Sequence, residues 1–162
     1  MNVAVITCSN RSARGERADD SGELLAGMLT NEGHEVLFRR IAPDEIDAIR
    51  HAVTDAMSAG ADAVLTNGGT GLTPTDVTPE AVKPLLHKEI PGIAEAIRLA
   101  SRDRVPTSVL SRGVAGSIGT TLVVTLPGSP GGVRDGMAVL TPLMVHAVDQ
   151  LRGGDHRPGG GV

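Results

Sequence analysis

The chain has 162 residues, a formal net charge of −4 and 40% hydrophobic residues, so it can bury a core and is not disordered throughout. Its single cysteine excludes an intramolecular disulfide. The acidic balance and the single aromatic residue, Phe38, argue against nucleic-acid binding. No stretch is apolar for long enough to span a membrane, and the first residues lack a basic region ahead of an apolar run, so we expect a cytoplasmic protein without a signal peptide.

Apolar patterns predict strands that alternate with helices. Short buried runs predict strands at Val3–Thr7, Glu35–Ile41, Ala61–Thr66, Thr107–Leu110 and Thr121–Leu126. Helical spacing and capping residues predict helices that begin at Asp20 or Ser21, at Pro43–Asp44, at Thr78, at Pro91 and near Gly131. This alternation predicts an α/β protein, a three-layer α/β/α sandwich with a mainly parallel sheet. We expect a single domain over residues 1–152 and a flexible, glycine-rich tail over residues 153–162.

Ligands of such sheets bind at the carboxyl ends of the strands. Three polar loops are predicted there, at Ser9–Ser21, Asn67–Asp76 and Gly128–Gly132, and Asp44 follows the second strand. The segment Asn67–Gly71 has three glycines in five residues, which suits backbone N–H groups that bind a phosphate. A tight turn that needs positive φ is the alternative. The usual nucleotide motifs, G-x-x-x-x-G-K-[ST] and G-x-G-x-x-G after the first strand, are missing.

Carboxylates accumulate at the same predicted edge, at Asp44, Asp76 and either Asp19 or Asp20. Oxygen ligands of this kind suit Mg²⁺, which proteins hold with one or two carboxylates together with substrate phosphates. Each aspartate alone could equally be a helix cap or a turn residue. Arginines of the first loop could bind phosphates or remain solvated, and Cys8 fits a small core residue better than a nucleophile.

Four segments in order resemble the Mog/MoaB-type family of molybdenum cofactor biosynthesis. They are Thr66–Gly71, Asp76–Ala81, Leu110–Gly113 and Leu126–Gly136, with Ile90–Gly92 and, more loosely, Ser9–Gly22 in addition. The resemblance runs from about Val3 to Gly154. It implies the same three-layer fold, a homotrimer and a molybdopterin adenylyltransferase, in which molybdopterin attacks the α-phosphorus of ATP and pyrophosphate leaves.

The resemblance also assigns roles to residues. Asp44 and Asp76 match the family's essential aspartates and would be the catalytic residues that hold Mg²⁺, while Ser111 matches a serine of the pterin site. Asp19 is preferred to Asp20 because of its spacing before Ser21 and Gly22. The expected substrate-binding and nucleotide-binding residues are Ser9, Asp19, Gly68, Gly69, Thr70, Gly71, Ser111, Arg112, Pro127, Gly128, Ser129 and Gly131.

Two other functions stay open at this point. The chain could be a catalytically silent paralogue that binds molybdopterin as a carrier or scaffold, since a fold survives the loss of its chemistry. Metal insertion is linked by the resemblance to a larger, multi-domain relative. An enzyme of this family would hand its product to such a molybdenum-insertion enzyme.

Overall fold

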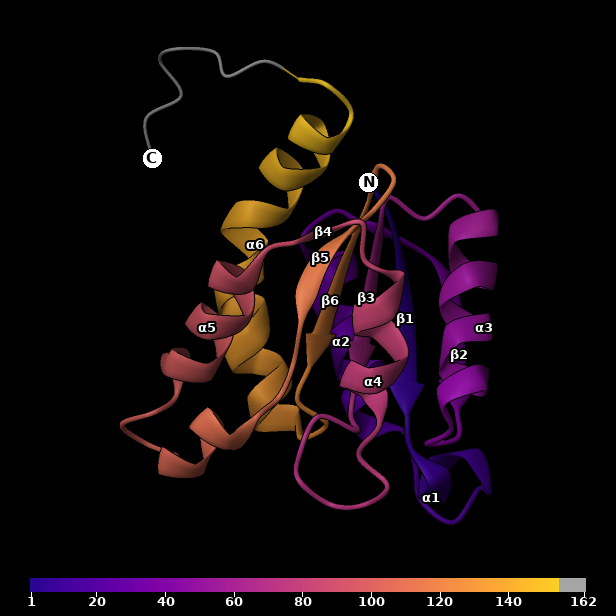
Figure 1. Cartoon of the computed structure of the whole chain (residues 1–162), viewed down its shortest axis with the longest axis vertical. Coiled ribbons are helices and arrows are strands. Elements are labelled where there is room, and N and C mark those ends of the chain that lie inside the picture. The colour runs from indigo at the N-terminus through magenta and orange to yellow at the C-terminus, as the bar shows by residue number, and fades with distance from the viewer. Residues whose placement is uncertain (155–162) are drawn as a thin grey trace.

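A computed structural model describes residues 1–154, and its six strands form one sheet in the order β2-β1-β3-β6-β5-β4. Neighbouring strands among β2, β1, β3 and β6 are parallel, whereas β5 is antiparallel to both β6 and β4. The carboxyl ends of the parallel strands therefore share one edge, the lower edge in Figure 1. The strands are β1 (Asn2–Cys8), β2 (Glu35–Ala42), β3 (Ala63–Asn67), β4 (Lys88–Glu89), β5 (Ala115–Ile118) and β6 (Thr121–Leu126).

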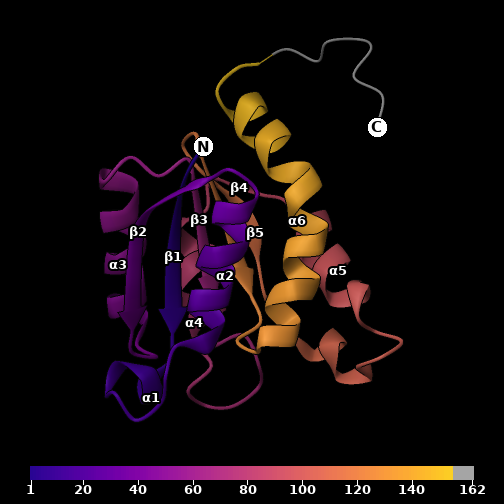
Figure 2. The same cartoon turned by 180° about the vertical axis from the view of Figure 1, so that it is seen from behind.

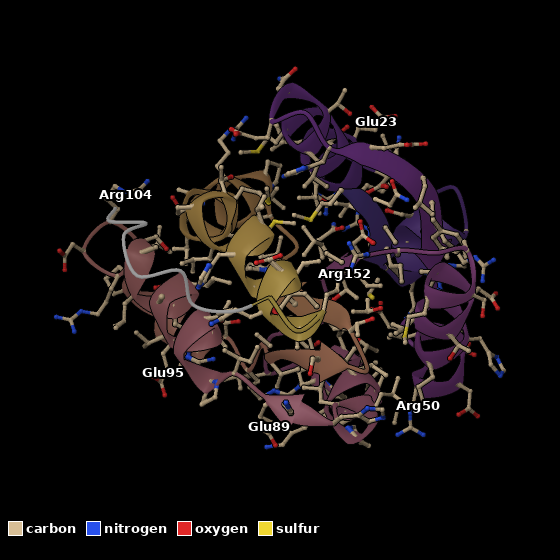
Figure 3. The ribbon with its side chains drawn as sticks, turned by 90° about the horizontal axis from the view of Figure 1, so that it is seen from above. Glu23, Arg50, Glu89, Glu95, Arg104 and Arg152 are labelled. Atoms are coloured by element: carbon tan, nitrogen blue, oxygen red, sulfur yellow. The ribbon has the colours of Figure 1, made fainter. Side chains whose placement is uncertain are left out.

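Helices cover both faces of the sheet and confirm the three-layer prediction. One face carries α2 (Asp20–Asn31), α5 (Pro91–Ala100) and α6 (Pro130–Leu151), and the other carries α3 (Ile46–Ser58) and α4 (Thr78–Val82). Figures 1 and 2 show these two layers from opposite sides. Charged side chains such as Glu23, Glu89 and Glu95 lie around the outside in the view from above (Figure 3).

The central strands are buried on both faces, as the continuous apolar runs predicted. In β1, Val3 and Val5 join the core under α2 and α6, while Ala4 and Ile6 join the core under α3. Successive side chains of a strand point to opposite faces. A central parallel strand therefore needs apolar residues at every position, not at alternate ones.

The strand predicted at Thr107–Leu110 is wrong. This segment is a 3₁₀ helix, η2 (Pro106–Leu110), with Val109 and Leu110 exposed. A proline at its first turn favours a helical start and contributes no N–H to a sheet ladder. The strand at this position of the chain is β5, which contains Gly116. A Cβ at Gly116 would collide with the carbonyl oxygen of Lys88 in β4, so the edge strand can approach closely only at a glycine.

The helix predicted to begin at Pro43–Asp44 begins later. Its N-cap is Glu45, which makes no side-chain capping bond, so Asp44 lies before α3 and does not cap it. The helix predicted to begin at Thr78 is short, because α4 passes directly into a 3₁₀ turn, η1 (Lys83–Leu85), which contains Pro84. A four-residue helix, α1 (Asn10–Ala13), was not predicted.

Within residues 1–154, no helix has the length and hydropathy that crossing a bilayer requires. The predicted tail at 153–162 lies outside the described residues from position 155 onward. The last described residues, Gly153 and Gly154, close the end of α6 with N–H bonds to the carbonyls of Gln150 and Asp149.

Candidate functional site

The chain after β3 turns sharply at two glycines. Gly68 and Gly69 have φ of +98° and +63°, values that residues with a Cβ rarely adopt. A Cβ at Gly68 would also collide with the carbonyl oxygen of Cys8. Thr78 holds the turn, because its hydroxyl donates to the Gly68 carbonyl at 2.9 Å and its N–H donates to the Gly69 carbonyl at 3.1 Å. The tight turn with positive φ is therefore present.

The same turn leaves three consecutive donors for a ligand. Among the described residues, the backbone N–H groups of Gly69, Thr70 and Gly71 reach no protein acceptor. Successive unpaired N–H groups in a turn form a concavity that favours anions. The tight turn is therefore compatible with the phosphate site that the sequence posed as its alternative.

Asp44 is held by Asn10 at the end of β2. The N–H of Asn10 donates to Asp44 Oδ2 at 2.8 Å, and the N–H of Asp44 donates to Asn10 Oδ1 at 3.0 Å. Partial burial raises the pKa of the Asp44 carboxyl, the Asn10 N–H opposes this shift, and the negative charge of Asp76 adds to it. The two carboxylates of the predicted pair therefore influence each other electrostatically.

We call the segment Asn67–Gly71 the glycine loop. Asp76 closes a second turn on its other side. Its Oδ2 accepts the N–H of Thr73 at 2.8 Å and the Thr73 hydroxyl at 2.7 Å. Arg112 supports the backbone of this segment, donating from Nε to the Gly71 carbonyl at 2.7 Å and from Nη2 to the Asp76 carbonyl at 2.5 Å. A further guanidinium bond goes to Glu80, so Arg112 organises the loop and is not aimed at the cavities described below.

The donor set at this loop fits Mg²⁺. An idealised Cβ on Gly69 would stand 3.3 Å from Asp44 Oδ1, and one on Gly71 would stand 2.8 Å from Asp76 Oδ2, so both carboxylates border the glycine loop. Within the described residues, no group of three or more His, Cys, Asp or Glu side chains is arranged to hold a metal. Mg²⁺ suits such a site because it keeps several waters and binds one or two carboxylates together with substrate phosphates.

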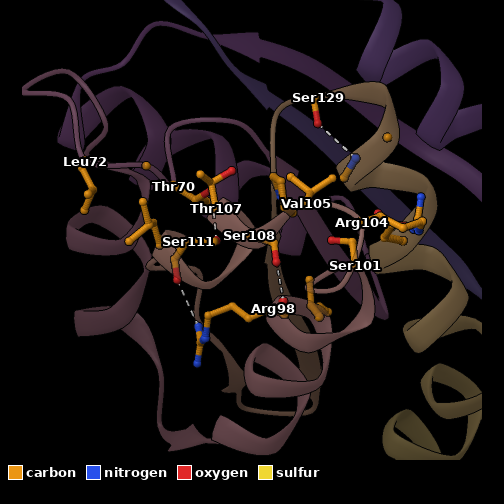
Figure 4. Close-up of a pocket in the computed structure, with 17 residues that line it drawn as sticks. Thr70, Leu72, Arg98, Ser101, Arg104, Val105, Thr107, Ser108, Ser111 and Ser129 are labelled. Carbon is orange, nitrogen blue, oxygen red and sulfur yellow. Dashed lines mark hydrogen bonds and ion pairs between the residues drawn. The ribbon is translucent and has the colours of Figure 1, made fainter.

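A cavity of about 450 Å³ opens on one side of the glycine loop, between α5, η2 and the start of α6 (Figure 4). We call it the apolar cavity, because Ile97, Val105, Leu110 and Pro127 contribute aliphatic walls. Its other lining residues are Thr70, Gly71, Leu72, Arg98, Ser101, Arg104, Thr107, Ser108, Ser111, Ser129, Gly131, Gly132 and Asp135.

A second hollow, of about 320 Å³, lies beside the first loop, and we call it the polar hollow. Hydroxyl, amide and charged side chains dominate its lining, which consists of Thr7, Cys8, Ser9, Ser12, Arg17, Ala18, Asp20, Ser21, Asn67, Gly128 and Ser129. Ser129 lines both cavities. Its hydroxyl accepts the N–H of Gly132 at 3.0 Å and caps α6, so one helix N-terminus separates the two spaces.

The structure brings most of the predicted residues to these two cavities. The apolar cavity is lined by Thr70, Gly71, Ser111, Pro127, Ser129 and Gly131, and the polar hollow by Ser9, Gly128 and Ser129. Gly68, Gly69, Asp44 and Asp76 form or border the loop between them. Asp19 lines neither cavity: it caps α2 by accepting the Gly22 N–H at 2.9 Å and also accepts the hydroxyl of Thr7 at 3.0 Å, while Asp20 lines the polar hollow.

Sequence reasoning missed residues that position the site. Asn67 is fully buried at the end of β3, where its amide accepts the Thr7 hydroxyl at 3.1 Å and donates to the Ser21 hydroxyl at 2.9 Å. Asn10 lay in the first predicted loop and Thr78 at a predicted helix start, both without a role in the site. A polar residue within a buried strand end is the signal that points to Asn67, because buried amides need partners.

Cys8 behaves as the sequence predicted, as a core residue and not as a nucleophile. Burial raises the pKa of its thiol to about 12, a hydrogen bond with Thr78 opposes this shift, and the charge of Asp44 adds to it. A thiol that stays protonated at neutral pH is a poor nucleophile.

Comparison with known proteins gives a consistent result. Residues 4–146 match the family described as "Probable molybdopterin binding domain". The molybdenum cofactor biosynthesis protein B of Bacillus subtilis is 40% identical over 156 residues, covering 94% of this chain and 91% of that protein. The molybdopterin adenylyltransferase of Pyrococcus furiosus is 37% identical over 157 residues, covering 94% and 92%. The molybdopterin biosynthesis Mog protein of Mycobacterium ulcerans superimposes with a TM-score of 0.88 at 46% identity, covering 93% and 98%.

The chain also matches parts of longer proteins. It spans 22% of the gephyrin of Dictyostelium discoideum and 48% of a molybdenum cofactor biosynthesis bifunctional protein of Synechococcus elongatus, at 36% and 38% identity. The matches to relatives of similar length cover nearly the whole of both chains. The six-stranded sheet, the glycine loop and these matches together make the chain a member of the Mog/MoaB family of molybdenum cofactor biosynthesis.

Proposed function

We propose that the chain is a molybdopterin adenylyltransferase that uses ATP and Mg²⁺. The observation that carries this proposal is the arrangement around Ser129. Two cavities of different polarity share this residue beside a loop with three unpaired N–H groups, and two carboxylates border that loop. A reaction that joins two substrates through their phosphates needs both binding sites to meet at a phosphate site. The name of the 37% identical relative from Pyrococcus furiosus supports the same activity.

In this proposal each substrate binds in the cavity whose polarity matches its own. The polar hollow, with Ser9, Ser12 and Asn67, offers hydrogen bonds to a ribose and a phosphate chain, so we assign the nucleotide to it. The apolar cavity, with Ile97 and Val105 as walls, suits the ring system of the pterin. Ser111 lies there, consistent with its expected place in the pterin site.

In this proposal the terminal phosphate oxygen of molybdopterin forms a bond to the α-phosphorus of ATP. The bond from that phosphorus to the bridging oxygen breaks, and pyrophosphate leaves with the electron pair. The N–H groups of Gly69, Thr70 and Gly71 would stabilise the negative charge that builds on the phosphoryl oxygens. Asp44 and Asp76 would hold Mg²⁺, which when bound neutralises part of the triphosphate charge. Asn10 and Thr73 orient these two carboxylates.

Several properties of the protein remain proposals that accompany this function. We propose a homotrimer, a cytoplasmic location and transfer of the product to a molybdenum-insertion enzyme. The metal of the final cofactor stays open, because one structurally similar relative, the MoaB protein of Pyrococcus furiosus, is described as tungsten cofactor synthesizing. Residues 1–152 would be sufficient for the activity.

The test is pyrophosphate release from ATP in the presence of molybdopterin and Mg²⁺. We expect release that requires molybdopterin in the native protein and that is lost in Asp44→Asn and Asp76→Asn. Asp55→Asn is the matched control, because Asp55 lies on the exposed face of α3 in an ion pair with Arg40. Exposed pairs contribute about 0–1 kcal/mol, so this variant should retain both fold and activity.

Two outcomes would overturn the proposal. A native protein that binds molybdopterin and ATP but releases no pyrophosphate would be a carrier or scaffold. Release that survives in both aspartate variants would remove the metal-site assignment and with it the proposed mechanism.

A further inference from the structure

One side of the apolar cavity carries polar groups that the phosphoryl chemistry does not use. Ser101 and Arg104 lie across the cavity from Thr70 and Leu72 in Figure 4. Asp135, from α6, also lines the cavity and accepts a hydrogen bond from Arg104 Nη2 on Oδ1 at 2.6 Å. These three residues lie away from the glycine loop, so their role differs from that of Thr70.

Ser101 is a buried residue whose hydroxyl faces the cavity and has no partner among the described residues. The residue is 7% exposed, and its hydroxyl points into the cavity in Figure 4. Among residues 1–154, no group forms a hydrogen bond with this hydroxyl. Buried polar side chains are nearly always hydrogen-bonded. The Ser101 hydroxyl therefore takes its partner from the cavity, either water or a polar atom of a ligand.

Asp135 offers acceptor capacity at the same side. Its side chain is 21% exposed, and within the described residues no donor reaches Oδ2. Oδ1 keeps a lone pair beyond the one that Arg104 uses. Arg104 balances the charge of the carboxylate from a side chain that is 68% exposed. The pair therefore accepts hydrogen bonds from a neutral ligand and does not require a cation.

A carboxylate with two accepting oxygens matches a ring edge that presents two adjacent N–H donors. The 2-amino-4-oxopyrimidine ring of a pterin presents its amino group beside the ring N3–H. The equivalent edge of adenine presents an amino group beside N1, an acceptor whose lone pair would face a carboxylate oxygen. Sites built around such hydrogen bonds discriminate strongly, because a wrong ligand leaves buried polar groups unpaired.

We propose that Asp135, together with Ser101, binds the aminopyrimidinone edge of the pterin and excludes adenine from the apolar cavity. This inference rests on the proposed function, since it names the residues that distinguish the two substrates. Arg104 keeps the Asp135 carboxylate in place and neutralises its charge. The nucleotide then binds in the polar hollow, both because Asp135 excludes adenine from the apolar cavity and because the hollow offers it hydrogen bonds.

The experiment uses three small probes and the full chain. Pterin and lumazine, its 2,4-dioxo analogue, are titrated by their own fluorescence, which is free of background because the chain has no Trp or Tyr. Adenosine is measured as a competitor of pterin. The proteins are the native chain, Asp135→Asn, Ser101→Ala and the control Asp103→Asn. Asp103 is the matched control, because its side chain is 97% exposed and it precedes Arg104.

We expect the native protein to bind pterin at least about tenfold more tightly than lumazine, with no competition from adenosine. Asp135→Asn should weaken pterin binding at least about tenfold and remove the preference over lumazine, because its amide N–H would face a ligand N–H. Ser101→Ala should show a smaller loss, and Asp103→Asn none. In the pyrophosphate assay, Asp135→Asn should raise the KM for molybdopterin and leave the KM for ATP unchanged.

Unchanged pterin affinity in Asp135→Asn, an equal affinity of the native protein for lumazine, or effective competition by adenosine would each overturn the inference. The same holds if the native protein binds no pterin. Molybdopterin-dependent pyrophosphate release in the same preparations separates a failure of this inference from a failure of the proposed function. If it persists while the binding preference is absent, only the assignment of Asp135 falls. If release is absent, the proposed function falls with it.

Discussion

Asn10 and Asp44 bind each other through two hydrogen bonds, each from the backbone N–H of one residue to the side chain of the other. This reciprocal contact joins the loop after β1 to the loop after β2 and fixes the direction of the Asp44 carboxylate. Because α3 begins only at Ile46 and has no side-chain cap, the carboxylate is left for the site. If Asp44 capped α3, its carboxylate would accept the first N–H groups of that helix and would not be available to a ligand.

Replacing Asn10 should therefore reduce activity more than stability. Asn10→Ala removes the side-chain acceptor for the Asp44 N–H, and a typical hydrogen bond contributes about 1 kcal/mol to stability. We expect a small decrease in melting temperature and a clear rise in the Mg²⁺ concentration needed for half-maximal pyrophosphate release. Asn31→Ala, at the exposed end of α2, is the control. An unchanged Mg²⁺ requirement in Asn10→Ala would mean that the backbone N–H of residue 10, which the variant keeps, is enough to hold the Asp44 carboxylate.

Asp44 should destabilise the metal-free protein as the pH rises. The pKa of its carboxyl is raised above the ordinary 3.8 by burial and by Asp76. The folded state then favours the protonated form, so the contribution of this group to stability is fully present below pH 3.8 and is lost as the pH rises through the raised pKa. Without Mg²⁺, Asp44→Asn should melt at a higher temperature than the native protein at pH 7.

This advantage of Asp44→Asn should shrink as the pH is lowered towards 4, which melting curves over a series of buffers would show. Its activity should nevertheless fall at least about tenfold, because the charge that would hold the metal is gone. A gap in melting temperature that stays constant with pH would contradict the assignment of the effect to this carboxyl.

The glycine loop should tolerate no side chain at its first position. Gly68 and Gly60 have nearly equal φ, +98° and +93°, but only Gly68 has a neighbour, the Cys8 carbonyl, where a Cβ would lie. Gly60→Ala should cost about 1–2 kcal/mol from the left-handed conformation alone. Gly68→Ala should cost at least about 2 kcal/mol more, measured by urea unfolding. Equal losses would show that the collision is relieved by a shift of the loop.

Arg112 should act on substrate affinity through the loop that contains Asp76. A lysine retains the charge but not the planar group that donates to the Gly71 and Asp76 carbonyls. We expect Arg112→Lys to raise the KM for ATP several-fold, about 1 kcal/mol, with little change in the melting temperature. Arg40→Lys is the control, because Arg40 of β2 also pairs with a carboxylate, that of Asp55, but lines neither cavity. Equal kinetics in the native protein and Arg112→Lys would argue against this role.

Cys8 should resist alkylation in the folded protein. With a pKa of about 12, about one thiol in 10⁴ is ionised at pH 8. We expect slow labelling by iodoacetamide without loss of activity, and rapid labelling after unfolding in guanidinium chloride. Fast labelling of the native protein would show that the end of β1 opens in solution.

The parts of the fold that depend on local patterns were predictable. The apolar runs of β1, β3 and β6 are buried on both faces, so their composition alone identifies them. The strand β5 was missed because Gly116 has no propensity for a strand and is there only to let Lys88 approach. Such a requirement arises from tertiary contact, which a single sequence does not display.

The candidate site also contains some residues that the sequence indicates and others that only the tertiary packing reveals. The glycines and Asp44 follow strands directly, and Asp76 lies in the same loop as the glycines, so the topology of a parallel sheet brings them to one edge. Ser101 and Asp135 lie at the end of one helix and in the second turn of another, with nothing nearby to mark them as polar groups of a cavity. Their significance depends on how α5 packs against α6. Asp19, selected by its spacing before Ser21 and Gly22, caps α2 and lines neither cavity.

Ser129 contributes to the walls of both cavities and caps α6 with its hydroxyl. A ligand that moves this residue in one cavity also changes the shape of the other. The two affinities are then energetically coupled, and linkage requires the coupling to be reciprocal: whatever factor the first ligand imposes on the second, the second imposes on the first. Through the cap of α6, the filling of one cavity would then influence the affinity of the other.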